Sequence, residues 1–207
     1  MKPFKVSLDG AGAAARLDLA LIESRRPLLL WVQQGGSSPI PHCLLSRLLR
    51  HPMPVTGWIG GDVAGPTAWI LLAADSVFVR PGSRLAPVPY PGPGAVLLPL
   101  RIGSLLTRRV AFRGGILFER DIVRGGWGTR FSGDVEAAAK EVSRRFAGLS
   151  PAALSLLRPL VHRQTGLHPL QATALERYTF SLAWAHGDAR AGVRAFFEKR
   201  APRFDST

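Results

Sequence analysis

Short apolar runs that alternate with helical stripes are the feature of this sequence that most constrains its fold. The runs indicate buried strands, and the stripes between them indicate helices. We expect strands at residues 5–9, 27–33, 55–59 and 76–79. We expect helices between them at residues 14–25, 44–49 and 68–74. Alternation of this kind is typical of an α/β fold with a mostly parallel sheet.

The second half of the chain is predicted to be helical. The expected helices are residues 97–111, 135–149, 170–185 and 189–199. A further helix is expected to start at Ser150 and Pro151. Ser132 or Asp134 is the predicted N-cap of the second of these, because a short polar side chain there satisfies a free backbone N–H. We therefore expect one domain with two parts, a core at residues 1–147 and a C-terminal helical region at residues 148–207 that packs on the outside or on a neighbour.

The composition suits a single compact domain, since the chain has 207 residues of which 46% are hydrophobic. No apolar run approaches the roughly 20 residues that a membrane-spanning helix needs. The N-terminal residues lack an apolar signal-peptide core, so we expect a cytoplasmic protein with no membrane contact. Cys43 is the one cysteine, which excludes an intrachain disulfide and a multi-cysteine zinc site. We expect Cys43 to be buried on a helix, and we expect no metal site.

The net charge of +13 comes almost entirely from arginine. Nucleic acid is the usual partner of so basic a chain, but these arginines are scattered singly and in pairs, with no basic helix, zinc finger or stacking motif. Arginine also pairs with phosphate in a bidentate fork. The charge therefore fits a phosphorylated cofactor, an acidic carrier protein that bears one, or a solvated basic surface, better than it fits nucleic acid.

Two stretches of the chain carry a resemblance to a known family. Residues 60–77 read GGDVAGPTAWILLAADSV. They resemble the segment N-G-x-A-x-G-G-G-x-E-L-A-x-x-C-D-I of the crotonase (enoyl-CoA hydratase/isomerase) superfamily. Residues 192–204 read GVRAFFEKRAPRF and are similar to the C-terminal segment E-G-x-x-A-F-x-E-K-R-x-P-x-F of that family. The chain is identified as a divergent, short member with degraded hydratase motifs.

The resemblance implies a fold and a chemistry. The fold would be a spiral of ββα repeats whose C-terminal helices make the contacts of a trimer or hexamer. The ligand would be an acyl thioester of coenzyme A or of an acyl carrier protein, with no cofactor beyond the coenzyme A or phosphopantetheine of the substrate. Two backbone N–H groups, the oxyanion hole, would hold the thioester oxygen as an enolate develops.

The sequence departs from the family at the positions that carry this chemistry. The family's oxyanion donor falls on Pro66 in the triplet Gly65-Pro66-Thr67, and proline has no N–H. The first catalytic glutamate falls on Trp69, which would line the pocket, and the second falls near Pro89 in a segment without an acid. A hydratase that activates water with two glutamates is therefore not expected.

The remaining candidate site residues are few. Asp62 is either a turn residue or a displaced acid or base. Gly36 or Ser37 would supply the second oxyanion N–H. Lys199 and Arg200 match the family's contact to the 3′-phosphate of coenzyme A, or else form a solvated basic face.

Asp75 matches a structural aspartate of the family. His162 and His168 bracket Gly166, and we assign them no role.

Two functions fit this pattern, and we favour the first. One is a biosynthetic, lyase-type crotonase that dehydrates, decarboxylates or cyclises a thioester through an enolate, as in polyketide or other secondary-metabolite pathways. The alternative is a non-catalytic helper subunit that enhances a partner enzyme, as the loss of the N–H at Pro66 and the indole at Trp69 suggest.

Overall fold

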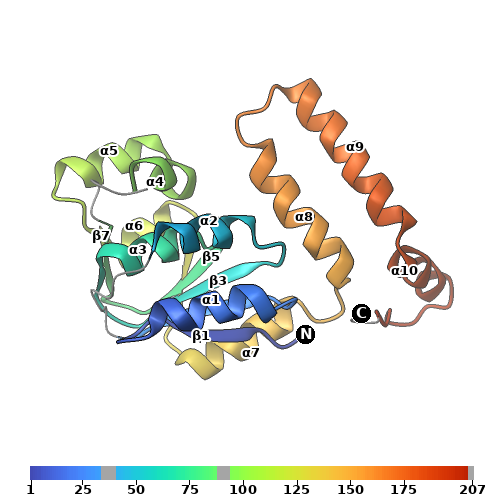
Figure 1. Ribbon diagram of the computed structural model, residues 1–207, viewed down its shortest axis with the longest axis horizontal. Coiled ribbons are helices and arrows are strands. Elements are labelled where there is room, and N and C mark those ends of the chain that lie inside the picture. Colours follow the sequence, from blue (N-terminus) through green and yellow to red (C-terminus); the bar gives the residue numbers. More distant parts are fainter. Residues whose placement is uncertain (34–40, 88–93, 205–207) are drawn as a thin grey trace.

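A five-stranded sheet forms the centre of the computed structural model, which describes residues 1–33, 41–87 and 94–204 (Figure 1). The strands lie in the order β1-β2-β3-β5-β8, and every neighbouring pair is parallel. They are β1 (Phe4–Ser7), β2 (Leu28–Val32), β3 (Val55–Ile59), β5 (Ser76–Val79) and β8 (Gly128–Arg130). The α/β class and the four expected strands are confirmed, but β8 was not predicted.

The residues of the central strands alternate between two apolar layers, as the period of two in a strand requires. On one face, Leu28 and Leu30 of β2 join a core that includes residues of α1 (Ala13–Glu23), α2 (His42–Arg50) and α3 (Gly65–Leu72). On the other face, Leu29 packs with Trp58 and Phe78 against α7 (Val135–Arg145). The sheet is thus covered on both sides, which explains the continuous apolar runs of the sequence.

A second, three-stranded sheet lies beside the first and was not predicted. It consists of β4 (Val63–Ala64), β6 (Arg84–Ala86) and β7 (Leu117–Phe118), followed by α6 (Glu119–Arg124). β4 pairs with β6 in parallel, and β6 pairs with β7 antiparallel. These strands have only two or three residues each, too few to produce an alternating pattern in the sequence.

The single helix expected at residues 97–111 is wrong, because two helices occupy this region. They are α4 (Gly94–Ile102) and α5 (Ser104–Phe112). Gly103 lies between them with a φ of 76°, a positive value through which a helix cannot continue and which glycine adopts without steric cost. A turn follows α5 at Gly114 and Gly115, which both have a positive φ.

Three helices complete the chain: α8 (Pro151–Gln164), α9 (Pro169–Ala185) and α10 (Gly187–Phe197). Asp134 caps α7 by accepting a hydrogen bond from the N–H of Ala137, so the second of the two predicted caps is the one that forms. The helix start expected at Ser150 and Pro151 is confirmed, and the side chain of Ser150 accepts a hydrogen bond from the N–H of Ala153. α8 and α9 run side by side, and α10 lies at the end of this pair where α8 begins (Figure 1). There the hydroxyl of Ser150 donates to Asp188. None of the residues of α9 is buried.

Cys43 is exposed on α2, so its predicted burial is wrong: it lies on the outer side of the helix, while Leu44, Leu45 and Leu48 face the core. In the described part of the chain, none of the helices has the length and apolarity to cross a membrane.

Candidate functional site

The N-terminal end of α3 holds most of the predicted site residues. The chain leaves β3, forms β4, and enters α3 at Gly65, whose φ of 60° is left-handed and favours glycine. Pro66 lies in the first turn of α3, where its missing N–H costs the helix nothing. Thr67 is buried and Trp69 is partly buried. The expected helix is confirmed, although it begins at Gly65 and not at residue 68. The oxyanion and pocket roles of these residues stay predictions.

Asp62 precedes this end of α3 and is held by an arginine of the neighbouring strand β6. The Nε of Arg84 donates to its carboxylate at 3.0 Å, and both side chains are about half exposed, at 53% for Asp62 and 54% for Arg84. The hydrogen bond from Arg84 lowers the pKa of Asp62. A carboxylate with a lowered pKa is a weaker base, so this geometry fits a turn residue better than a proton acceptor.

The second half of the predicted oxyanion hole cannot be placed. Gly36 and Ser37 lie outside the described residues, as does the segment around Pro89 where the second family glutamate would fall.

Lys199 and Arg200 end α10 in a tight backbone turn. The N–H of Lys199 donates to the carbonyl of Phe196, and the N–H of Arg200 donates to the carbonyl of Ala195, both at 3.1 Å. Lys199 has a φ of 51°, as the residue at this point of a helix C-cap usually does. α10 and α3 lie on opposite sides of the molecule (Figure 1). One chain therefore does not bring Lys199 to its own Gly65.

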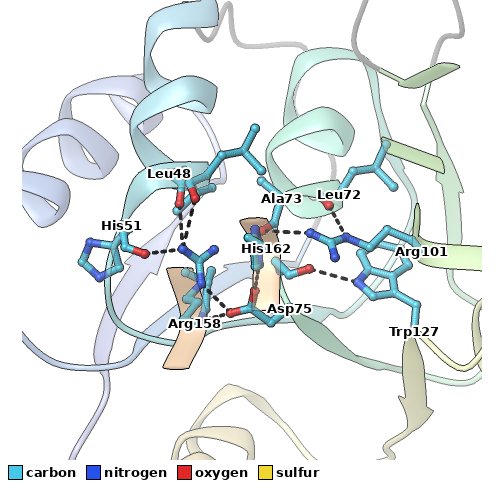
Figure 2. A network of polar contacts seen from close by, with 12 residues as sticks. Leu48, His51, Leu72, Ala73, Asp75, Arg101, Trp127, Arg158 and His162 are labelled. Carbon is cyan, nitrogen blue, oxygen red and sulfur yellow. Dashed lines mark hydrogen bonds and ion pairs between the residues drawn. The ribbon is translucent and has the colours of Figure 1, made fainter. Parts of the chain in front are cut away.

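A polar network surrounds the other end of α3, and the sequence did not predict it (Figure 2). Asp75 follows the helix and accepts three hydrogen bonds. The N–H of Val55 donates at 2.7 Å, while the Nε of Arg158 and the Nε2 of His162 both lie at 2.8 Å. Arg158 and His162 are four residues apart, so they project from the same face of α8.

The two guanidinium groups of this network cover the C-terminal ends of two helices (Figure 2). Arg158 donates through Nη1 to the carbonyls of Leu48 and His51 at the end of α2. Arg101 donates through Nε to the carbonyl of Leu72, at the end of α3, at 2.7 Å. Cations are stabilising here, because the last carbonyls of a helix carry partial negative charge.

Burial and charge shift the pKa values of the groups in this network. Burial raises the pKa of Asp75, but the hydrogen bond from His162 and the charge of Arg158 outweigh it, so the pKa is lowered. Burial and the charge of Arg158 lower the pKa of His51 from 6.5 to about 4. Burial also lowers the pKa of Arg101. At neutral pH, Asp75 is therefore ionised and His51 is neutral.

A cavity of about 470 Å³ opens beside the network, between α4 and α8. Its polar lining is Asp75, Arg101, Arg158, His162 and Thr165. Its apolar lining is Leu49, Pro54, Leu97, Leu100, Phe146, Leu154, Leu157 and Val161. The role assigned to Asp75 as a structural residue agrees with its contacts, whereas His162, which was given no role, is one of its partners.

Known proteins are similar in sequence to this chain over most of its length. No family model matches the chain. The chain is 30% identical over 171 residues to 1,2-epoxyphenylacetyl-CoA isomerase of Escherichia coli. This match covers 78% of this chain and 64% of that protein. The chain is 29% identical over 207 residues to a Rhodobacter capsulatus protein named "probable enoyl-CoA hydratase", which covers 95% of this chain and 73% of that protein.

The structure also resembles a solved enoyl-CoA hydratase. It matches the crystal structure of the Bacillus anthracis enzyme with a TM-score of 0.84 and 17% sequence identity. The match covers 98% of this chain and 95% of that chain, so the two share one fold from end to end.

Proposed function

We infer a function from one premise: this chain belongs to the crotonase superfamily and has its fold. We propose that it binds an acyl thioester of coenzyme A or of an acyl carrier protein at the N-terminal end of α3. We further propose that it acts on this thioester through an enolate, by decarboxylation, dehydration or cyclisation. The observation that carries the proposal is the retained entry into α3 at Gly65, with a left-handed φ, in the segment that resembles the family's oxyanion motif.

The N-terminal end of a helix is electropositive whether or not each residue of its first turn carries an N–H. Gly65 and Thr67 supply backbone N–H groups on either side of Pro66. A developing thioester oxyanion placed here would be stabilised by the helix end, and preorganised stabilisation of this kind is often the largest catalytic contribution. This supports an enzyme that retains part of the family's oxyanion hole.

Hydration is the family reaction that this site fits least. The indole of Trp69 stands on α3 at the position of the first glutamate, and indole cannot take a proton from water. Asp62 is the carboxylate nearest to Gly65 in the sequence, but Arg84 pairs with it and lowers its pKa. We therefore expect no measurable hydration of crotonyl-CoA.

Decarboxylation makes the smallest demand on these residues. When the bond from the α-carbon to the carboxylate of a malonyl thioester breaks, CO₂ leaves and the electron pair remains as the enolate. A proton from water then completes the acetyl thioester. No base is needed to remove a carbon-bound proton, so the loss of both glutamates does not prevent this reaction.

The alternative function is a non-catalytic helper subunit, and Pro66 is the observation that favours it. If turnover needs both oxyanion donors, Pro66 stands at the position of one of them and has no N–H to donate. Such a chain could still bind a thioester or a partner enzyme without turning anything over.

A decarboxylation assay separates the two functions. Malonyl-CoA is incubated with the wild-type chain and with Pro66→Gly, and acetyl-CoA is measured by mass spectrometry. An enzyme forms acetyl-CoA, and the restored N–H raises the rate by up to about 100-fold. Acetyl-CoA formation by neither protein, with 3-hydroxybutyryl-CoA also unchanged, would reject the enzyme and leave the helper.

We also propose that copies of this chain assemble through the C-terminal helices. Large apolar side chains are exposed there, and such surfaces mark protein interfaces. They include Leu170, Tyr178, Phe180, Trp184, Phe196 and Phe197. An assembly would also allow Lys199 of one copy to approach α3 of another. Light scattering is expected to give a trimer or hexamer that dissociates in Phe180→Ser with Trp184→Ser, and a wild-type monomer would contradict this.

A further inference from the structure

The cavity between α4 and α8 is separate from the proposed thioester site. α3 starts beyond the C-terminal end of β3 and returns to Asp75, which pairs with the start of that strand. The two sites therefore lie at opposite ends of α3, about 12 Å of helix apart. The volume of about 470 Å³ lies in the range of small-molecule sites.

The carboxylate that lines this cavity is already fully engaged. Asp75 accepts from Val55, Arg158 and His162, and so has little capacity left to hold a ligand. The titratable groups of the lining are Asp75, Arg101, Arg158 and His162. Two guanidinium groups thus face a single carboxylate, with the helix carbonyls neutralising part of the excess.

Several donors of the lining have no acceptor among the residues that the structure describes. Arg101 uses Nε and Nη2, which leaves Nη1. His162 donates its Nε2–H to Asp75, so Nδ1 of the neutral imidazole is an acceptor and adds no free donor. The Nη2 of Arg158 is buried and without a partner in the described parts of the chain, and a buried donor of this kind is costly. An acceptor from outside the chain would complete this end of the cavity.

The rest of the lining is apolar and reaches the surface. Leu97 and Leu154 are buried, while Leu100, Leu157 and Val161 are each about half exposed. A ligand with an anionic head and an aliphatic tail matches this division, since its head would meet the free donors and its tail would cover the exposed rim.

We propose that the cavity between α4 and α8 binds an amphipathic carboxylate, such as a medium-chain fatty acid. Arg101 and Arg158 hold the carboxylate, and the leucines of α4 and α8 enclose the chain. The site takes a free acid, and its occupation does not require the thioester site.

Octanoate is the probe, and octan-1-ol is the matched neutral control with the same tail. Calorimetric titration of the full chain is expected to show one octanoate per chain, with octanol bound at least about tenfold more weakly. Equal binding of the two would reject a carboxylate site. Absence of octanoate binding at about 1 mM would also reject the carboxylate site. This holds too if binding fails because a second copy of the chain fills the cavity.

Three variants connect this binding to the cavity. Leu157→Trp fills the cavity from a half-exposed position and is expected to abolish octanoate binding, while Ile22→Trp, at an exposed position of α1, leaves it unchanged. Arg101→Gln keeps a donor for the carbonyl of Leu72 but removes the charge, and is expected to weaken binding at least about tenfold. Octanoate binding that survives Leu157→Trp would place the ligand elsewhere and overturn the proposal.

Discussion

The two ends of α3 differ in how firmly the rest of the molecule holds them. At the N-terminal end, Gly65 and Pro66 are partly exposed, and Asp62 and Arg84 form an ion pair in water. At the C-terminal end, Arg158 is only 5% exposed and ties Asp75 to the end of α2. The end that resembles the family's oxyanion motif is therefore loosely held, and the end at the structural aspartate Asp75 is the one that joins the helices to the sheet.

Arg158→Met should produce the largest effect, because it removes one partner of a buried ion pair. Asp75 then keeps a buried charge without its main partner, and the carbonyls of Leu48 and His51 lose a donor. We expect the free energy of unfolding to fall by about 3–5 kcal/mol in urea titrations.

Arg84→Met is the matched control at the other end of α3. It breaks the exposed pair with Asp62, and we expect no measurable change in the free energy of unfolding. Equal losses for the two variants would remove the contrast between the ends of the helix.

The next effect is a pH dependence that belongs to the C-terminal end. The pKa of His51 is about 4 in the folded chain, against 6.5 for a free histidine. Below about pH 6.5 the unfolded chain therefore binds a proton that the folded chain does not. The contribution of His51 to the free energy of unfolding is fully present above that pH. About 3 kcal/mol of it is lost as the pH falls to about 4.

His51→Leu tests this pH dependence. The buried Nε2 of His51 has no partner among the described residues, so an apolar side chain should be tolerated at pH 7. Unfolding measured from pH 7 to pH 4 should show a shallower decline in the variant than in the wild type. An unchanged decline would mean that other groups cause it.

The smallest effect is expected at the N-terminal end. Pro66 lies in the first turn of α3, where proline is compatible with the helix and restricts the unfolded chain. Pro66→Ala should lower the free energy of unfolding by about 0.4–1 kcal/mol, measured as above. A larger loss would show that this end of α3 is held more tightly than its exposure suggests.

Features that depend on local sequence could be predicted. The strands around Leu30 and Trp58 follow from apolar runs, and the caps at Asp134 and Ser150 follow from short polar side chains before a helix. Pro66 at the start of α3 follows from the fixed φ of proline.

Features that depend on contacts far apart in the chain could not be predicted. Asp75 meets Arg158 across 83 residues and His162 across 87 residues, and no spacing rule connects them. Gly103 breaks a stretch whose apolar spacing fits a single helix. Cys43 was expected to be buried because of its residue type alone, but it lies on the exposed side of α2.

Binding of butyryl-CoA tests most directly whether the loosely held end of α3 remains a thioester site. Butyryl-CoA and its analogue without the 3′-phosphate are titrated by calorimetry into the wild-type chain, Lys199→Ala and the control Lys2→Ala. We predict that the wild type and Lys2→Ala bind butyryl-CoA equally, and that Lys199→Ala or loss of the 3′-phosphate weakens binding by about tenfold. Absence of binding to the wild-type chain would contradict the account.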